Sequence, residues 1–100
     1  MQPVILNIPG AALEALCTRY KVQRLAFFGS VLRQDFHAES DVDVLVEFLP
    51  NATIGWEIVS LEAELGALIG RRVDLRTAQA LSRHFRHEVL ENAQTFYEQA

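Results

Sequence analysis

The alternation of acidic and aliphatic residues over positions 41–48 constrains the fold of this chain more than any other feature. These residues read Asp-Val-Asp-Val-Leu-Val-Glu-Phe. Successive side chains of a β-strand point to opposite faces, so the pattern predicts a strand with one aliphatic face and a second face that carries Asp41 and Asp43. A third acid, Asp74, lies between a valine and a leucine in a short run of the same kind. We therefore expect all three carboxylates on the open face of a sheet whose other face packs against helices.

Hydrophobic periodicity divides the rest of the chain into helices and strands. It predicts helices over residues 11–19, 56–69 and 82–91, strands over 22–28, 41–48 and 72–75, a short helix over 30–34 and a polar loop over 35–40. Residues 94–97 fit either more helix or a short edge strand. Half of the residues are hydrophobic and 22% are charged, as in globular proteins. We expect one domain over residues 1–100 with an α/β (α+β) fold, in which a small mixed sheet has helices packed on one face.

Three residues outside the strands carry separate expectations. Gly70 is placed to cap the helix that ends before it. Cys17 lies in an amphipathic helix and is expected to be a packed thiol; as the single cysteine it excludes an intrachain disulfide and suits a reducing cytoplasm. Trp56 is expected in the core, with the alternative that it anchors a partner at an exposed helix start.

The pair Gly29-Ser30 supplies a candidate phosphate site. It follows an apolar strand and precedes a helical turn, which places two backbone amides and a hydroxyl at a helix N-terminus. Asp41 and Asp43 project from the same face of the next strand, where two carboxylates are well placed to share hard cations such as Mg²⁺. The chain therefore carries the parts needed to hold phosphate and divalent metal close together.

The spacing of these parts resembles that of a known superfamily. Gly29-Ser30, ten intervening residues and Asp41-Val42-Asp43 resemble the G-S, spacer, D-x-D signature of the DNA polymerase β-type nucleotidyltransferases. The resemblance runs from about residue 22 to residue 75, and more weakly to residue 97.

Further residues narrow the resemblance to the minimal nucleotidyltransferases, the MNT family. Arg33, the pair Ser40-Asp41 and the aliphatic run 44–46 resemble that family, and residues 71–75 are similar to its third-carboxylate strand. One departure is Gln34, where the family usually has glycine. Glycine gives the backbone freedom at a helix end, so the departure affects the expected path of the following loop. It changes no residue that is expected to contact metal or phosphate.

The resemblance implies a nucleotidyltransferase fold and an adenylyltransferase that uses ATP and two Mg²⁺ ions. It implies that Asp41 and Asp43 hold both ions and that Asp74 holds the ion that activates the attacking hydroxyl and helps to accept its proton. The residues implied to contact the nucleotide are Gly29, Ser30, Arg33 and Ser40. From the residues alone, Arg33 has the alternative of pairing with a nearby acid.

Charge and size bear on the substrate that receives the nucleotide. The net charge is −4 and Lys21 is the only lysine, which argues against a long nucleic acid as substrate. No apolar stretch is long enough to cross a membrane. The resemblance implies that the acceptor is a tyrosine of a partner HEPN-type ribonuclease toxin, for which the chain acts as antitoxin.

Two other functions stay open at this point. The chain could be a binding antitoxin or regulator that neutralises its partner by contact, or a transferase for a small molecule such as an aminoglycoside. Both homo-oligomers and hetero-oligomers also stay open.

Overall fold

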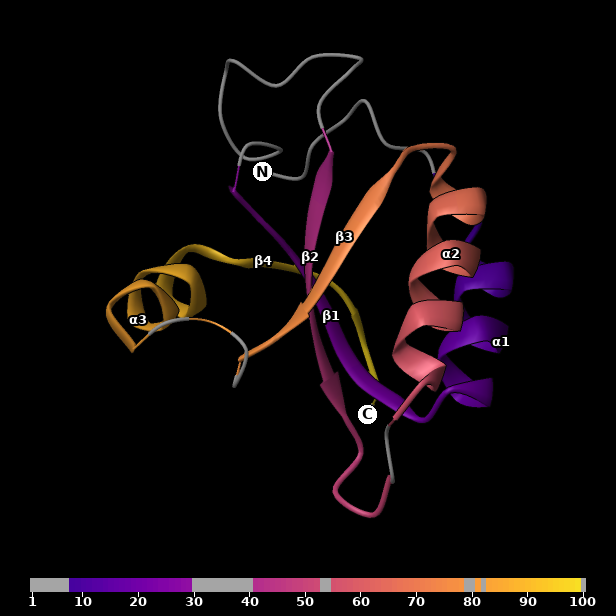
Figure 1. Cartoon of the computed structure of the whole chain (residues 1–100). Coiled ribbons are helices and arrows are strands. Elements are labelled where there is room, and N and C mark those ends of the chain that lie inside the picture. The colour runs from indigo at the N-terminus through magenta and orange to yellow at the C-terminus, as the bar shows by residue number, and fades with distance from the viewer. Residues whose placement is uncertain (1–7, 30–40, 53–54, 79–80, 82, 100) are drawn as a thin grey trace.

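The computed structural model describes residues 8–29, 41–52, 55–78, 81 and 83–99. Along the chain, its elements are α1 (Gly10–Arg19), β1 (Val22–Phe28), β2 (Val42–Phe48), α2 (Glu57–Ile69), β3 (Val73–Thr77), α3 (Arg83–Asn92) and β4 (Gln94–Glu98), as Figure 1 shows. The expected helices and strands in these ranges are confirmed to within about two residues at each end. The ambiguous residues 94–97 form a strand. The short helix expected over residues 30–34 and the loop over 35–40 lie outside the described residues.

The four strands form one mixed sheet in the order β3-β2-β1-β4. β1 pairs antiparallel with both β2 and β4, whereas β2 and β3 are parallel. A parallel pair needs a long crossover between its strands, and α2 is part of that crossover. The predicted mixed sheet of an α+β fold is therefore confirmed.

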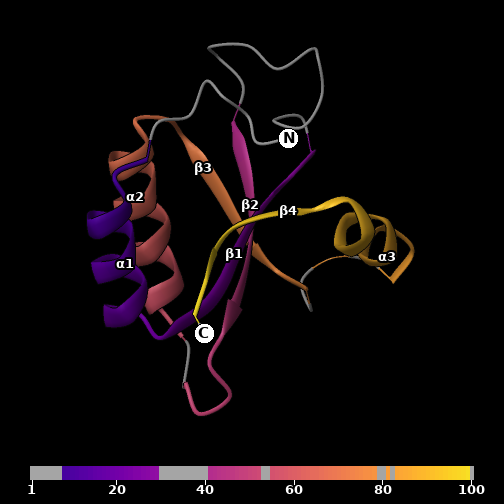
Figure 2. The same cartoon turned by 180° about the vertical axis from the view of Figure 1, so that it is seen from behind.

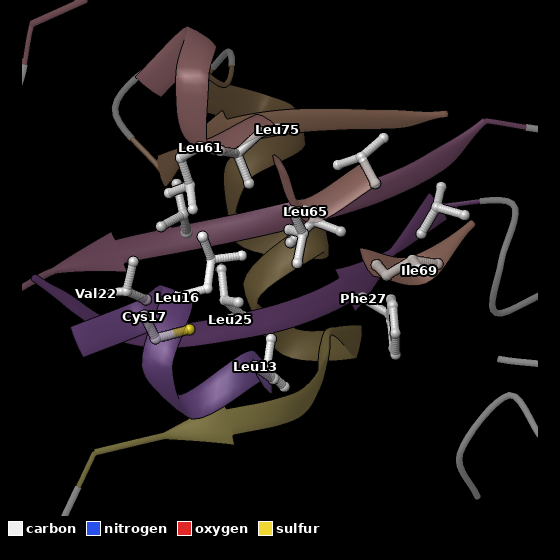
Figure 3. Packing of buried hydrophobic residues seen from close by; sticks show 14 residues of the cluster. Leu13, Leu16, Cys17, Val22, Leu25, Phe27, Leu61, Leu65, Ile69 and Leu75 are labelled. Atoms are coloured by element: carbon white, nitrogen blue, oxygen red, sulfur yellow. The ribbon is translucent and has the colours of Figure 1, made fainter. Parts of the chain in front are cut away.

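One face of the sheet packs against α1 and α2, which lie side by side in both views (Figures 1 and 2). The three valines of β2 point to this face and meet buried leucines of both helices, and Figure 3 shows the cluster. Leu25 of β1 and Leu61 and Leu65 of α2 are fully buried. Burial of each such side chain contributes roughly 1.5–3 kcal/mol, so this layer is the main source of stability.

The third helix departs from the expectation that helices pack on one face only. α3 lies on the opposite side of the sheet from α1 and α2 (Figures 1 and 2). Its Val89 joins a second buried cluster with Ala26 and Phe28 of β1 and Leu45 of β2. These strand residues point away from the main core, and α3 covers them because apolar side chains there would otherwise face water. The face that carries the acids is thus partly covered.

Single residues confirm two expectations and correct a third. Gly70 caps α2 in a left-handed conformation with φ of 79°, and Cys17 is fully buried. Burial raises the pKa of the Cys17 thiol to about 12. The core position expected for Trp56 is wrong: the residue directly precedes α2 and is 88% exposed. In the part of the chain that the structure describes, no helix combines the length and apolar character that a bilayer crossing requires.

Candidate active site

Two of the three acids lie side by side. Asp43 of β2 and Asp74 of β3 are register partners in the parallel pair, so their Cα atoms are neighbours across the two strands. The residues on either side of each acid are buried in the main core, and strand alternation therefore turns both carboxylates to the opposite face. Both acids are partly buried. The sheet thus brings together two carboxylates that are far apart in the sequence, as expected.

Gly29 makes room for the carboxylate of Asp43. It directly follows β1, where Phe28 is the register partner of Asp43, and its φ of 74° lies in the left-handed region that glycine favours. A Cβ atom at position 29 would collide with Asp43 Oδ2 and would lie 3.2 Å from Cγ. The absence of a side chain at position 29 therefore allows the backbone and the Asp43 carboxylate to approach closely.

Asp41 lies just before β2 and near the same end of the parallel pair. The backbone N–H of Val42 donates to the carbonyl oxygen of Arg72 at 2.8 Å, which fixes the start of β2 against the start of β3. The carboxylate of Asp41 lies 4.0 Å from Nε of Arg72; the Arg72 side chain is largely exposed and that of Asp41 is half exposed. An exposed ion pair at that distance is weak, so Asp41 can change partner at little cost.

Arg76 is a residue of this site that the sequence reasoning missed. It lies two residues after Asp74 on the same strand face, and its guanidinium donates hydrogen bonds to the Asp74 carboxylate. Nη2 donates to Oδ2 at 3.1 Å, and Nε donates to both oxygens at 3.3 Å. The hydrogen bond and charge of Asp74 raise the pKa of Arg76, with smaller effects from Asp43 and Glu62. The signal was present in the sequence, since Arg72, Asp74 and Arg76 alternate along one strand and must share a face.

Glu62 connects α2 to the same strand. Its Oε2 accepts a hydrogen bond from the backbone N–H of Leu75 at 2.8 Å. β3 is an edge strand, and this contact satisfies a donor that a strand partner would otherwise take. Glu62 therefore holds β3 against α2 at the edge of the sheet.

The chemistry of the three acids suits a divalent metal, although Asp41 and Asp74 each form an ion pair with an arginine. Carboxylate oxygens are the ligands that Mg²⁺ prefers, and the strand pairing places Asp43 and Asp74 next to each other. Over the described ranges, no three Asp, Glu, His or Cys side chains come together in a form that could hold a metal ion. Asp41 faces Arg72 and Asp74 faces Arg76, so a three-carboxylate set requires both acids to turn from these partners.

Three residues expected to contact the nucleotide, Ser30, Arg33 and Ser40, lie outside the described residues, and their roles stay predictions. The structure places Gly29 next to Asp43 and Asp43 next to Asp74. The expected partnership of these residues with phosphate and metal also stays a prediction.

Comparison with known proteins places this arrangement in context. A family model described as a nucleotidyltransferase domain matches residues 11–96. The protein adenylyltransferase MntA of Thermococcus cleftensis is 38% identical over 73 residues, which is 71% of this chain and 71% of that protein. A solved protein proposed to be a minimal nucleotidyltransferase superposes with a TM-score of 0.67 at 35% identity, over 83% of this chain and 84% of the other.

More distant structures share the fold. A chain from the crystal structure of a toxin–antitoxin with AMP-PNP superposes with a TM-score of 0.68 at 20% identity, over 89% of this chain and 73% of that chain. A chain from the complex of the tri-AMPylated HEPN toxin of Shewanella oneidensis with an MNT antitoxin gives a TM-score of 0.61 at 19% identity, over 89% of this chain and 69% of the other. At these identities, the likeness shows the fold alone.

Proposed function

Because this chain belongs to the nucleotidyltransferase domain family, we propose that it transfers AMP from ATP to a hydroxyl group of a partner protein. The relative at 38% identity, MntA of Thermococcus cleftensis, is named a protein adenylyltransferase, which supports both the nucleotide and the protein acceptor. The observation that carries the proposal is the in-register pair Asp43 and Asp74 on the face opposite α1 and α2, with Gly29 against Asp43.

The proposed acceptor is a tyrosine of a HEPN toxin, for which this chain acts as antitoxin. The complex from Shewanella oneidensis contains an AMPylated HEPN toxin and an MNT antitoxin, and the fold likeness to this chain motivates the same class of partner. The net charge of −4 agrees with a protein acceptor better than with a nucleic acid backbone.

The proposed reaction is an in-line displacement at the α-phosphorus of ATP. The hydroxyl oxygen of the acceptor forms a bond to the α-phosphorus, the bond from that phosphorus to the bridging oxygen breaks, and pyrophosphate leaves. Asp41, Asp43 and Asp74 would hold two Mg²⁺ ions, which would supply positive charge to offset the charge that develops during the transfer. Asp74 helps to accept the hydroxyl proton, and Gly29 and Ser30 hold the β- and γ-phosphates through backbone N–H groups and a hydroxyl. Arg33 and Ser40 add further contacts to the nucleotide.

The test is transfer between purified proteins. The chain and a HEPN partner are incubated with α-labelled ATP and Mg²⁺, and the products are analysed by mass spectrometry. We expect AMP on a partner tyrosine and at least a hundredfold loss of transfer in Asp43→Asn, because an amide is a poor substitute for a metal-binding carboxylate. Glu47→Gln is the matched control: it changes an acid on the same strand face, away from the site, and should transfer normally.

A second candidate is neutralisation of the partner by contact alone. Trp56 is 88% exposed and Val59 of α2 is 57% exposed, and exposed apolar side chains of this size often mark protein interfaces. If Asp43→Asn inhibits the toxin as well as the wild type does, without nucleotide and without an adduct, the contact function replaces the transferase.

A further inference from the structure

We propose that Arg76 is a built-in counter-charge that occupies Asp74 while the site holds no metal and thereby sets the affinity of the site for divalent ions. The inference rests on the proposed function, because it concerns the metal that Asp43 and Asp74 would share. It assigns a positioning role to an arginine that needs no contact with the nucleotide.

The guanidinium of Arg76 contacts the same carboxylate oxygens of Asp74 that would bind a metal ion. Nε lies 3.3 Å from each carboxylate oxygen of Asp74, and Nη2 lies 3.1 Å from Oδ2. The guanidinium therefore uses lone pairs on both oxygens that a metal ion would need. Asp43, the register partner of Asp74, and Glu62 of α2 add negative charge around the same guanidinium.

The exposure of the pair makes exchange between two cations feasible. The Arg76 side chain is 49% exposed and that of Asp74 is 38% exposed, so water can solvate the guanidinium when it leaves. Exposed ion pairs of this kind are weak. A divalent ion on Asp74 would in turn repel a guanidinium only a few ångströms away. Metal and Arg76 therefore compete for the same carboxylate.

The competition has a use in the metal-free protein. Carboxylates gathered on one strand pair repel each other, which favours local opening of the strands. Arg76 offsets this repulsion without closing the site, because its hold on Asp74 is reversible. The arginine thus keeps the Asp74 carboxylate oriented until a stronger cation arrives.

The experiment measures metal affinity directly. Mn²⁺ is titrated into the full chain, with and without a non-hydrolysable ATP analogue, and free Mn²⁺ is followed by electron paramagnetic resonance. We expect Arg76→Gln to bind Mn²⁺ on the order of three- to tenfold more tightly at low salt, because a competing positive charge is gone. The gain should shrink at high ionic strength, where exposed charges are screened. Arg76→Lys keeps the positive charge but loses the two-nitrogen contact of the guanidinium. Its affinity for Mn²⁺ should lie between those of the wild type and Arg76→Gln.

Arg19→Gln is the matched control. Arg19 of α1 makes a similarly exposed ion pair, with Nη2 at 2.9 Å from Glu64 Oε1, on the helical side of the sheet. The variant has the same change in net charge and should bind Mn²⁺ as the wild type does. An equal gain in Arg19→Gln overturns the inference, because the effect would then come from net charge alone.

The remaining outcomes are also decisive. If the wild type binds Mn²⁺ and a folded Arg76→Gln binds it equally or less tightly, the inference fails while the proposed function stands. If Arg76→Gln does not fold, wild-type affinity in Arg76→Lys at low and high salt likewise overturns the inference. If no variant binds Mn²⁺, with or without the analogue, the metal-dependent function fails and the inference fails with it.

Discussion

At the scale of single residues, the close approach of Gly29 to Asp43 is the tightest constraint in the site. Position 29 combines a positive φ with a carboxylate where a side chain would begin. Gly70 also has a positive φ, and nothing lies within 4 Å of the place where its Cβ would be. The two glycines therefore separate the cost of backbone strain from the cost of displacing Asp43.

We predict that Gly29→Ala and Gly70→Ala share the cost of backbone strain and that only Gly29→Ala damages the site. Each substitution should lower the free energy of unfolding by roughly 1–2 kcal/mol, because a residue with a Cβ is forced into a left-handed conformation. Only Gly29→Ala should also lose the stabilisation given by Mn²⁺ with ATP, since its Cβ displaces the Asp43 carboxylate. Chemical denaturation with and without the ligands measures both effects. An undiminished ligand response in Gly29→Ala would show that Asp43 works from another position.

The residues also show what the sequence could predict about the site and what it could not. Alternation along two strands was enough to place Asp43 and Asp74 on one face, because strand geometry leaves a side chain only two directions. The partners of the carboxylates were not predicted, because an exposed side chain chooses among neighbours through its torsion angles and those neighbours are known only once the strands are placed. The ion pair between Asp74 and Arg76 is such a contact, and it was therefore not predicted.

At the scale of elements, most boundaries followed from the sequence, while the position of α3 did not. Apolar periodicity marks which residues of a helix are buried, but it carries no information about which face of the sheet covers them. Leu45 was on the predicted acidic face of β2, and as an apolar residue there it was the available sign that this face needs a cover. β4 was ambiguous because five residues are too few to separate a helical period from a strand period.

The contact between α2 and β3 gives a prediction at this scale. Glu62→Ala should lower the free energy of unfolding by about 1 kcal/mol, because the Leu75 N–H loses its acceptor at the edge of the sheet. Glu62→Gln keeps an acceptor oxygen and should retain most of that stability. Urea denaturation of the three proteins provides the comparison. Equal losses in both variants would assign the effect to the charge of Glu62 and would remove the hydrogen bond as its cause.

At the scale of the whole molecule, the site should couple ligand binding to global stability. A ligand that binds only the folded chain at ten times its dissociation constant stabilises it by about 1.4 kcal/mol, which for a domain of this size raises the melting temperature by roughly 6–11 °C. We predict such a rise for Mg²⁺ with ATP. Asp41→Asn combined with Asp43→Asn should remain folded and lose the rise, and Glu47→Gln should keep it. Differential scanning fluorimetry measures the shift, and an equal rise in the double variant would exclude these acids from the site.

The strand order also determines when the sheet is complete during synthesis. β1 is a central strand, and its second neighbour, β4, is the last described strand to be made. At roughly 5–20 residues per second, a ribosome spends several seconds between the two. Throughout that interval one side of β1 presents unpaired backbone groups, which other nascent chains can use as a template. A chain stalled before residue 94 would therefore already hold Asp43 and Asp74, while the side of β1 that pairs with β4 would still be open to other chains.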